Sequence, residues 1–245
     1  MKIDLNCDMG EGCGNDAELM DYVSSINIAC GLHAGDAATM AKTVETAFKK
    51  GVSIGAHPGY PDRENFGRTA MNLSSKQVRE IITEQITALN NIAATRGGKL
   101  SHVKPHGALY NQAARDAELA AAIAEAVFEF DPSLVLFGLS GSVSISEAEK
   151  RGLKTASEFF ADRTYKNDGS LTPRSEANAL IHYTDEALGQ VLDIIKYGRV
   201  RSTDAIMIPI AADTVCIHGD GANAVEFAKA INRALKAGGI EITPL

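Results

Sequence analysis

Short apolar segments alternate with longer amphipathic segments along this chain, and this alternation limits the fold more than any other feature. Apolar residues spaced about 3.6 apart indicate helices, and short apolar runs between turn residues indicate buried strands. Strands that alternate with helices form parallel sheets, so we expect an α/β fold. The expected strands are Lys2–Asn6, Ser25–Ala29, Val52–Ala56, Leu100–Lys104, Leu134–Gly138, Lys154–Ser157, Ala205–Ile210 and Thr214–Ile217.

Local signals also predict where the helices begin. Asp36 and Asp116 are expected N-caps, and Ser74 with Gln77 has the spacing of a capping box. Two further helices are expected to begin at Thr184 and near Gly221. The pattern therefore contains seven or eight β/α units.

The length of 245 residues is typical of a single α/β barrel. Hydrophobic residues make up 45% of the chain and charged residues 22%, which is enough apolar surface to form a full core. No Pro/Ser-rich linker, fixed-period repeat or low-complexity segment divides the sequence. We therefore predict one domain over residues 1–245, closed as a barrel.

Charge and hydropathy exclude several classes of partner. The net charge is −7 and no run of Lys and Arg forms a basic patch, so no nucleic-acid partner is expected. No stretch approaches the ~18 consecutive apolar residues of a membrane span, and the start lacks the apolar core of a signal peptide. We expect a cytoplasmic protein without membrane contact. The widely spaced Cys7, Cys13, Cys30 and Cys216 are interpreted as packing residues, with a role at the edge of a site left open.

Polar residues gather where the expected strands end. In α/β barrels, the loops after the strands carry the chemistry, because the carboxyl ends of all the strands open on one face. Glu158, Asp162 and Arg163 follow the sixth expected strand. Five of the six histidines lie at or beside strand ends, namely His33, His57, His102, His106 and His218.

Asp8, Glu11, His33 and His57 support two different chemistries. They could supply nitrogen and oxygen ligands to a divalent metal ion, or they could act without metal as a general acid and base. The alternative without chemistry is that Asp8 caps a helix and the histidines bond to loop backbone. The spacing contains no compact metal motif that would decide between these interpretations.

Lys104 and His106 flank Pro105 at a strand end and are interpreted as catalytic residues. The alternative is that Lys104 only forms an ion pair with a carboxylate. Several loop residues are assigned to an anionic small substrate, because guanidinium groups bind carboxylates or phosphates bidentately. The guanidinium groups are those of Arg68, Arg163 and Arg174, each of which alone could be an ordinary surface ion pair. The polar Asn6 and Asp162 complete the expected substrate-binding set. The chain has no G-x-x-x-x-G-K-[ST] phosphate loop, no G-x-G-x-x-G dinucleotide motif and no G-x-S-x-G elbow, which disfavours a nucleotide site or a serine nucleophile within this chain.

Several polar, glycine-rich segments resemble the LamB/YcsF family, which comprises the A component of the ATP-hydrolysing 5-oxoprolinase and its lactam-utilisation relatives. The segments are DLNCDMGEG, NIACGLHAGD, GAHPGYPD with FGR, VKPHGALYN, EFFADRTY with PR after it, and CIHGD. They run in order from Asp4 to Asp220, close to the whole chain.

The resemblance implies a distorted β/α barrel similar to that of the glycoside hydrolase/deacetylase superfamily. It also implies the A component of a three-component enzyme that opens 5-oxoproline (pyroglutamate) to L-glutamate with ATP hydrolysis, together with subunits B and C. The Asp-His-His metal set of the deacetylases suggests Asp8, His33 and His57 here, although the spacing departs from the deacetylase motif.

Two alternatives stay open. The chain could be a stand-alone metal-dependent amidohydrolase or deacetylase, which would be active without partners and sensitive to chelators. It could also be a non-catalytic subunit that only binds the lactam, and such a subunit would tolerate loss of the Asp8 charge.

Overall fold

The computed structural model describes residues 1–221 and 223–245, and its centre is a closed barrel of parallel strands. Seven strands pair in the order β1-β2-β3-β4-β5-β6-β9, and β9 pairs with β1 to close the ring. The strands are β1 Lys2–Met9, β2 Ser25–Ala29, β3 Ser53–His57, β4 His102–Val103, β5 Val135–Leu139, β6 Lys154–Phe160 and β9 Thr214–Ile217. The short β10, Glu241–Ile242, pairs with the start of β1. The predicted α/β barrel is confirmed.

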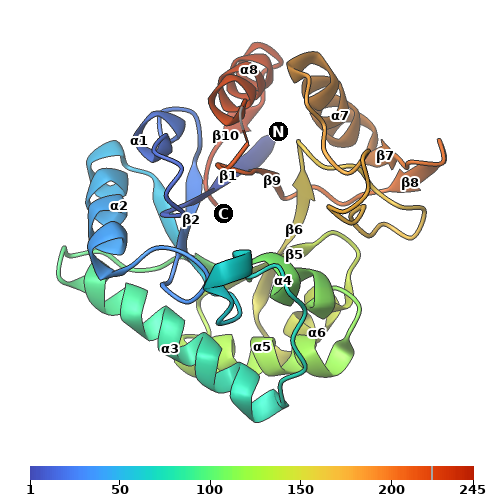
Figure 1. Cartoon of the computed structure of the whole chain (residues 1–245). Coiled ribbons are helices and arrows are strands. Elements are labelled where there is room, and N and C mark those ends of the chain that lie inside the picture. The colour runs from blue at the N-terminus through green and yellow to red at the C-terminus, as the bar shows by residue number, and fades with distance from the viewer. Residues whose placement is uncertain (222) are drawn as a thin grey trace.

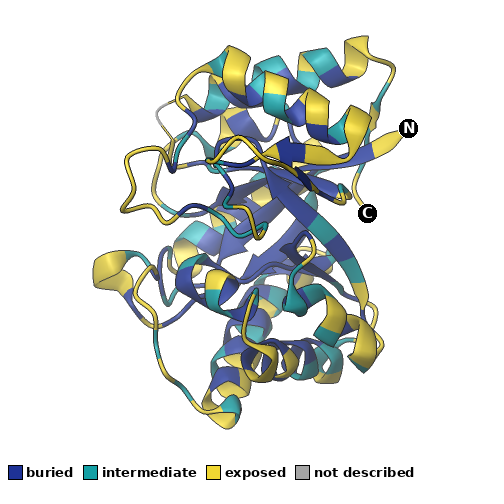
Figure 2. Ribbon diagram, turned by 90° about the vertical axis from the view of Figure 1, so that its right-hand side faces the viewer, coloured by how far each residue is buried: buried dark blue, intermediate teal, exposed yellow. Residues whose placement is uncertain are grey.

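Helices surround the strands, as Figure 1 shows. They bury their apolar faces against the barrel, so Figure 2 shows buried strands inside and exposed residues on the outer helix faces. The helices are α1 Asp16–Leu19, α2 Ala37–Lys50, α3 Ser75–Ala94, α4 Gly107–Ala113, α5 Ala117–Phe130, α6 Val143–Arg151, α7 Thr184–Tyr197 and α8 Ala224–Ala237, with a 3-10 turn η1 at Arg63–Asn65. Among the described residues, no helix combines the length and the hydropathy needed to cross a membrane.

The predicted helix starts are largely confirmed. The Asp36 side chain accepts from the Thr39 N–H, and Asp116 accepts from the N–H groups of Glu118 and Leu119. Ser74 and Gln77 form a reciprocal capping box. The last helix is the exception, because it begins at Ala224 rather than near Gly221.

The expected strand Ala205–Ile210 is not part of the barrel. Residues within it form β8, Met207–Pro209, which pairs antiparallel with β7, Arg199–Arg201. Ala205 takes a φ of 64° in the turn between them. Because β6 pairs directly with β9, the barrel has no place for another strand here, and Met207 remains 44% exposed. The apolar run is therefore part of a surface ribbon.

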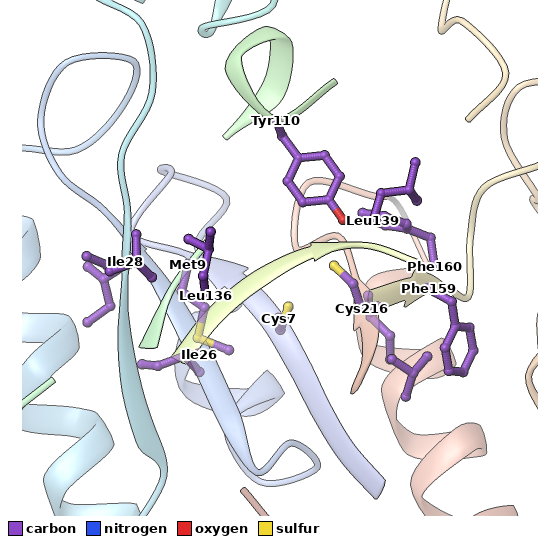
Figure 3. Close-up of a cluster of buried hydrophobic side chains, with 14 of the residues drawn as sticks. Cys7, Met9, Ile26, Ile28, Tyr110, Leu136, Leu139, Phe159, Phe160 and Cys216 are labelled. Carbon is purple, nitrogen blue, oxygen red and sulfur yellow. The ribbon is translucent and has the colours of Figure 1, made fainter. Parts of the chain in front are cut away.

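Alternation along β1 explains how polar groups enter the barrel. Successive side chains of a strand point to opposite faces. The odd-numbered residues of β1 belong to the apolar core, part of which is drawn in Figure 3. The even-numbered Asp4, Asn6 and Asp8 point into the barrel and bond to Ser25 of β2, Glu158 of β6 and Lys104 directly after β4. The strand extends to Met9, three residues beyond the expected Asn6, so Asp8 lies within the strand.

Candidate active site

A cavity of about 520 Å³ opens at the carboxyl ends of the barrel strands. This is where barrels of parallel strands place their chemistry, and the volume suits a small-molecule ligand. Its walls combine carboxylates, histidines and cationic side chains from loops that are distant in sequence. They include Asp8, Glu11, His57, Arg68, Lys104, His106, Tyr110, Arg163, Arg174 and His218.

Lys104 is the charged centre of this cavity. Its side chain is only 2% exposed, and Nζ lies 2.9 Å from Asp8 Oδ1, 2.9 Å from Glu158 Oε1 and 2.9 Å from Cys216 Sγ. Burial alone would lower the pKa of Lys104, but Asp8, Cys216 and Glu158 raise this pKa well above its ordinary value. The ammonium group is therefore charged at neutral pH and aimed at the cavity floor.

Asp8 stays ionised beside it. Burial would raise the pKa of Asp8, yet His57 and Lys104 hold this pKa well below its usual range. Asn27 Nδ2 donates a further hydrogen bond of 2.8 Å to Asp8 Oδ1, while Oδ2 lies 3.4 Å from His57 Nε2. A buried carboxylate of this kind can accept a proton or hold an electrophile.

Three histidines form a second group above this pair. The His33 and His106 rings stack with centroids 3.8 Å apart, and the His57 ring meets both edge-on. Glu11 Oε1 lies 3.4 Å from His106 Nδ1 and 3.6 Å from His33 Nε2. Burial lowers the pKa of His33 to about 3 and raises the pKa of Glu11 well above its ordinary value, with Asp8 adding to the latter. The four side chains have the composition of a metal-ligand group.

Glycines allow this crowding. A Cβ atom on Gly59 would lie 2.6 Å from His33 Nδ1, and one on Gly67 would lie 2.8 Å from His33 Cβ. Gly67 also has a φ of 66°, which side chains disfavour. Gly107 is crowded in the same way, because a Cβ atom there would lie 2.6 Å from the Gly67 carbonyl oxygen.

A family model described as the LamB/YcsF family matches residues 3–245. The chain belongs to the LamB/YcsF family. The crystal structure of the lactam utilization protein from Thermus thermophilus is similar to this chain, at 43% identity and a TM-score of 0.93 over 100% of both chains. The resemblance expected from the sequence is thereby confirmed.

More distant structures share the barrel alone. A truncated 3-deoxy-D-arabino-heptulosonate 7-phosphate synthase from Thermotoga maritima is 9% identical, with a TM-score of 0.52 over 99% of this chain and 90% of that one. A deacetylase determined with substrate is 13% identical, with a TM-score of 0.51 over 99% of this chain and 87% of that one. At these identities the similarity is one of fold.

The structure brings together most of the residues that the LamB/YcsF sequence singles out. Asp8, Glu11, His57, Lys104 and His106 line one cavity, and His33 lies directly behind them against His106. Arg68 and Arg174 line the same cavity, with Arg68 paired to Asp220 at 2.6 Å.

Three expected substrate-binding residues have structural partners. Asn6 is fully buried below the cavity, where its amide bonds to Glu158, Thr214 and Asn27. Arg163 lines the cavity, but its guanidinium donates to the carbonyls of Ala179 and Thr172 and so secures the loop after β6. Asp162 accepts from His218 Nδ1 at 2.8 Å. His218 itself lines the cavity.

Sequence reasoning placed His218 and Glu158 at strand ends without giving them a role, left the role of Cys216 open, and did not single out Tyr110. Glu158 is expected after the sixth strand, but β6 continues to Phe160 and Glu158 points into the barrel, fully buried. The available signal was a charge directly before two apolar residues, Phe159 and Phe160, which are buried with it. Tyr110 lies in α4, and Figure 3 shows its hydroxyl directed towards Leu139 and Phe160. Within the described residues, that hydroxyl has no hydrogen-bond partner.

The contacts also show the roles of the cysteines and of His102. Cys7, Cys30 and Cys216 are buried and free, whereas Cys13 is exposed. Cys216 contacts Lys104, so of the buried three it is the one with a polar role at the site. His102 bonds to Ser101 and Asn27 and stacks on Phe137 at 4.2 Å, which makes it part of the barrel interior.

Proposed function

We propose that this chain is the A component of a three-component, ATP-hydrolysing 5-oxoprolinase that cleaves 5-oxoproline to L-glutamate in the cytoplasm, with subunits B and C as its partners. Membership of the LamB/YcsF family supports a role in lactam metabolism. The similar protein from Thermus thermophilus is named for lactam utilization, which supports the same substrate class.

The observation that carries the proposal is the buried Lys104 with Asp8 on the floor of the cavity, at 2.9 Å. A fixed positive charge beside an ionised carboxylate is suited to amide hydrolysis, because one stabilises negative charge while the other takes a proton. Arg68 and Arg174 on the same cavity wall match the carboxylate that 5-oxoproline carries.

A lactam is an unreactive amide, and this explains the need for ATP. In the proposed reaction, the γ-phosphoryl group of ATP is transferred to the lactam carbonyl oxygen, which leaves ADP. Water then adds to the same carbon, the ring C–N bond breaks as the nitrogen gains a proton, and an acyl phosphate remains. A second water hydrolyses this acyl phosphate, which gives L-glutamate and phosphate. Asp8 accepts the proton of the water, and Lys104, 2.9 Å from Asp8, stabilises the oxyanion. His57 is the other candidate base only when its Nε2 holds no metal ion.

His106 and Glu11 complete the catalytic set in this proposal, and ATP acts at the level of the complex. We also propose that a divalent metal ion takes part at the histidine group, where it would polarise the carbonyl or the attacking water. The same group is the specific observation in favour of the second candidate, a stand-alone metal-dependent amidohydrolase.

The test is an assay of glutamate release from 5-oxoproline and ATP by the purified chain, with and without subunits B and C. We expect no turnover by the chain alone and ATP-dependent glutamate formation by the mixture. Turnover by the chain alone, lost on chelation, would establish the second candidate. No turnover in the complete mixture would refute the 5-oxoprolinase proposal.

A further inference from the structure

We infer that Glu11, His33, His57 and His106 together bind one divalent transition-metal ion. The binding of the ion does not depend on the proposed function, whereas its part in lactam hydrolysis rests on it. The four residues come from the carboxyl ends of four successive barrel strands, and one ligand atom from each lies within 4.8 Å of the others. This ligand set differs from the set Asp8, His33 and His57 that the family resemblance suggests.

The hydrogen bonds of two rings show which nitrogens are free to coordinate. His57 Nδ1 lies 2.7 Å from the Lys104 carbonyl, and His106 Nε2 lies 2.8 Å from the Phe66 carbonyl. A carbonyl oxygen only accepts, so both of these nitrogens carry hydrogen. In the neutral rings, His57 Nε2 and His106 Nδ1 therefore present lone pairs, and they lie only 2.9 Å apart. Two lone pairs at this distance repel each other unless they share a cation.

Glu11 and His33 complete the group. Glu11 Oε1 lies 3.4 Å from His106 Nδ1, 3.6 Å from His33 Nε2 and 3.8 Å from His57 Nε2. Ligand atoms at about 2.0–2.2 Å from a common ion are separated by no more than about 4.4 Å. In the parts of the chain that the structure describes, Glu11 Oε1 and both ring nitrogens of His33 lack a hydrogen-bond partner. Buried polar atoms are costly without partners, and one ion would satisfy the carboxylate and one nitrogen of His33.

The surroundings favour a transition metal. Metal-binding histidines usually donate their other N–H to a carbonyl or carboxylate, as His57 and His106 do. Three imidazoles and one carboxylate suit zinc and its neighbours better than magnesium or calcium. A second group, Asp8, Cys216 and His218, is a poorer site, because the Lys104 ammonium already lies 2.9 Å from both Asp8 and Cys216.

The test is metal binding by the purified full chain after chelator treatment, without ATP, lactam or partners. Calorimetric titration with zinc chloride is expected to show one equivalent per chain, and cobalt chloride to give the visible absorption of a cobalt–histidine site. Zinc should also raise the melting temperature. Glu11→Gln and His106→Gln are each expected to weaken zinc binding at least tenfold. His218→Gln, from the second group, and His182→Gln, outside both groups, are matched controls expected to bind zinc as the wild type does.

Three results would overturn the inference: no stoichiometric zinc binding by the wild type, unchanged affinity in Glu11→Gln, or loss of affinity in His218→Gln with retention in His106→Gln. Circular dichroism of the metal-free variants checks folding, and Glu11→Gln, which keeps the side-chain shape, decides if His106→Gln does not fold. A chain that binds zinc but is inactive with subunits B and C would refute the proposed function and leave the metal site standing. An active complex whose chain binds no zinc would refute the metal site and leave the proposed 5-oxoprolinase function standing.

Discussion

Asp4 and Asp8 lie on the same face of β1, four residues apart, and both are buried, yet their surroundings differ. Asp4, at the amino end of the barrel interior, accepts hydrogen bonds from the hydroxyls of Ser24, Ser25 and Thr214 at 2.6–2.7 Å. Asp8, at the carboxyl end, faces the Lys104 ammonium and His57. At one end of the barrel the carboxyl group meets uncharged hydroxyl donors, and at the other end it meets the charged Lys104.

For this reason, the pKa values of the two carboxyl groups are shifted in opposite directions. Burial raises the pKa of Asp4 above 3.8, and its three hydroxyl partners offset only part of that effect. The pKa of Asp8 is held well below 3.8, against the effect of burial, by His57 and Lys104. Burial of a carboxylate is therefore not in itself a sign of function. The charged Lys104 beside Asp8 distinguishes the site from the scaffold.

The largest expected effect is that of Asp8→Asn. We expect a loss of turnover of about 10²-fold or more in the reconstituted complex, because the change keeps size but removes charge and basicity. The fold should survive, since Lys104 retains Glu158 at 2.9 Å. The measurement is glutamate release together with the melting temperature. Near-normal turnover by the folded variant would mean either that the chain binds the lactam without catalysis or that a metal-free His57 is the base.

Asp4→Asn is expected to change stability instead of chemistry. Asparagine can offer only one oxygen to the three hydroxyl donors, so we expect a loss of about 1–2 kcal/mol in the free energy of unfolding. Turnover per folded molecule should stay within about twofold of the wild type, because Asp4 has no part in the proposed acid–base chemistry. Urea unfolding and the glutamate assay measure the two quantities. A large loss of turnover by the folded variant would break the contrast between the two ends of the barrel.

The sign of the pH dependence sharpens that test. A carboxyl group whose pKa is raised by folding stabilises the protein most below its unfolded pKa, and this contribution declines as pH rises through the folded pKa. Because burial raises the pKa of Asp4 above 3.8, the stability difference between wild type and Asp4→Asn should shrink as pH rises from below 3.8. Urea titrations at several pH values measure this difference. A difference that grows with pH would show that the native environment favours the charged form.

The contrast also shows what could be predicted from the sequence. The helix caps at Asp36 and at Ser74 with Gln77 were predictable because their partners lie within three residues. The strand at Ala205–Ile210 was not, because its apolar pattern is local whereas a place in the barrel depends on β6 pairing with β9.

The site divides in the same way. Barrel topology brings all strand ends to one face, so the gathering of Asp8, His57, Lys104 and His106 could be predicted. The individual partners could not, because the contact of Lys104 with Cys216 spans 112 residues and no local pattern encodes it. Strand length mattered too, because β1 and β6 each run three residues beyond the prediction and so turn loop residues into interior ones.

The smallest expected effect is that of Ser74→Ala, at an exposed position. The Ser74 hydroxyl accepts from the Gln77 N–H at 3.4 Å, while Gln77 Oε1 accepts from the Ser74 N–H at 3.0 Å. Alanine removes the first of these hydrogen bonds, together with the one that the Ser74 hydroxyl donates to Gln77 Oε1 at 2.8 Å, and leaves the second. We expect a loss of about 0.5 kcal/mol, the low end for N-caps. Gln77→Ala and the double variant complete a cycle, and urea unfolding of all four chains should give a small coupling energy of the stabilising sign. Zinc binding and turnover should be unchanged throughout, because neither residue lines the cavity. A loss of turnover in Ser74→Ala as large as that expected for Asp8→Asn would contradict this contrast. It would show that turnover also depends on residues that have no contact with the charged groups of the cavity.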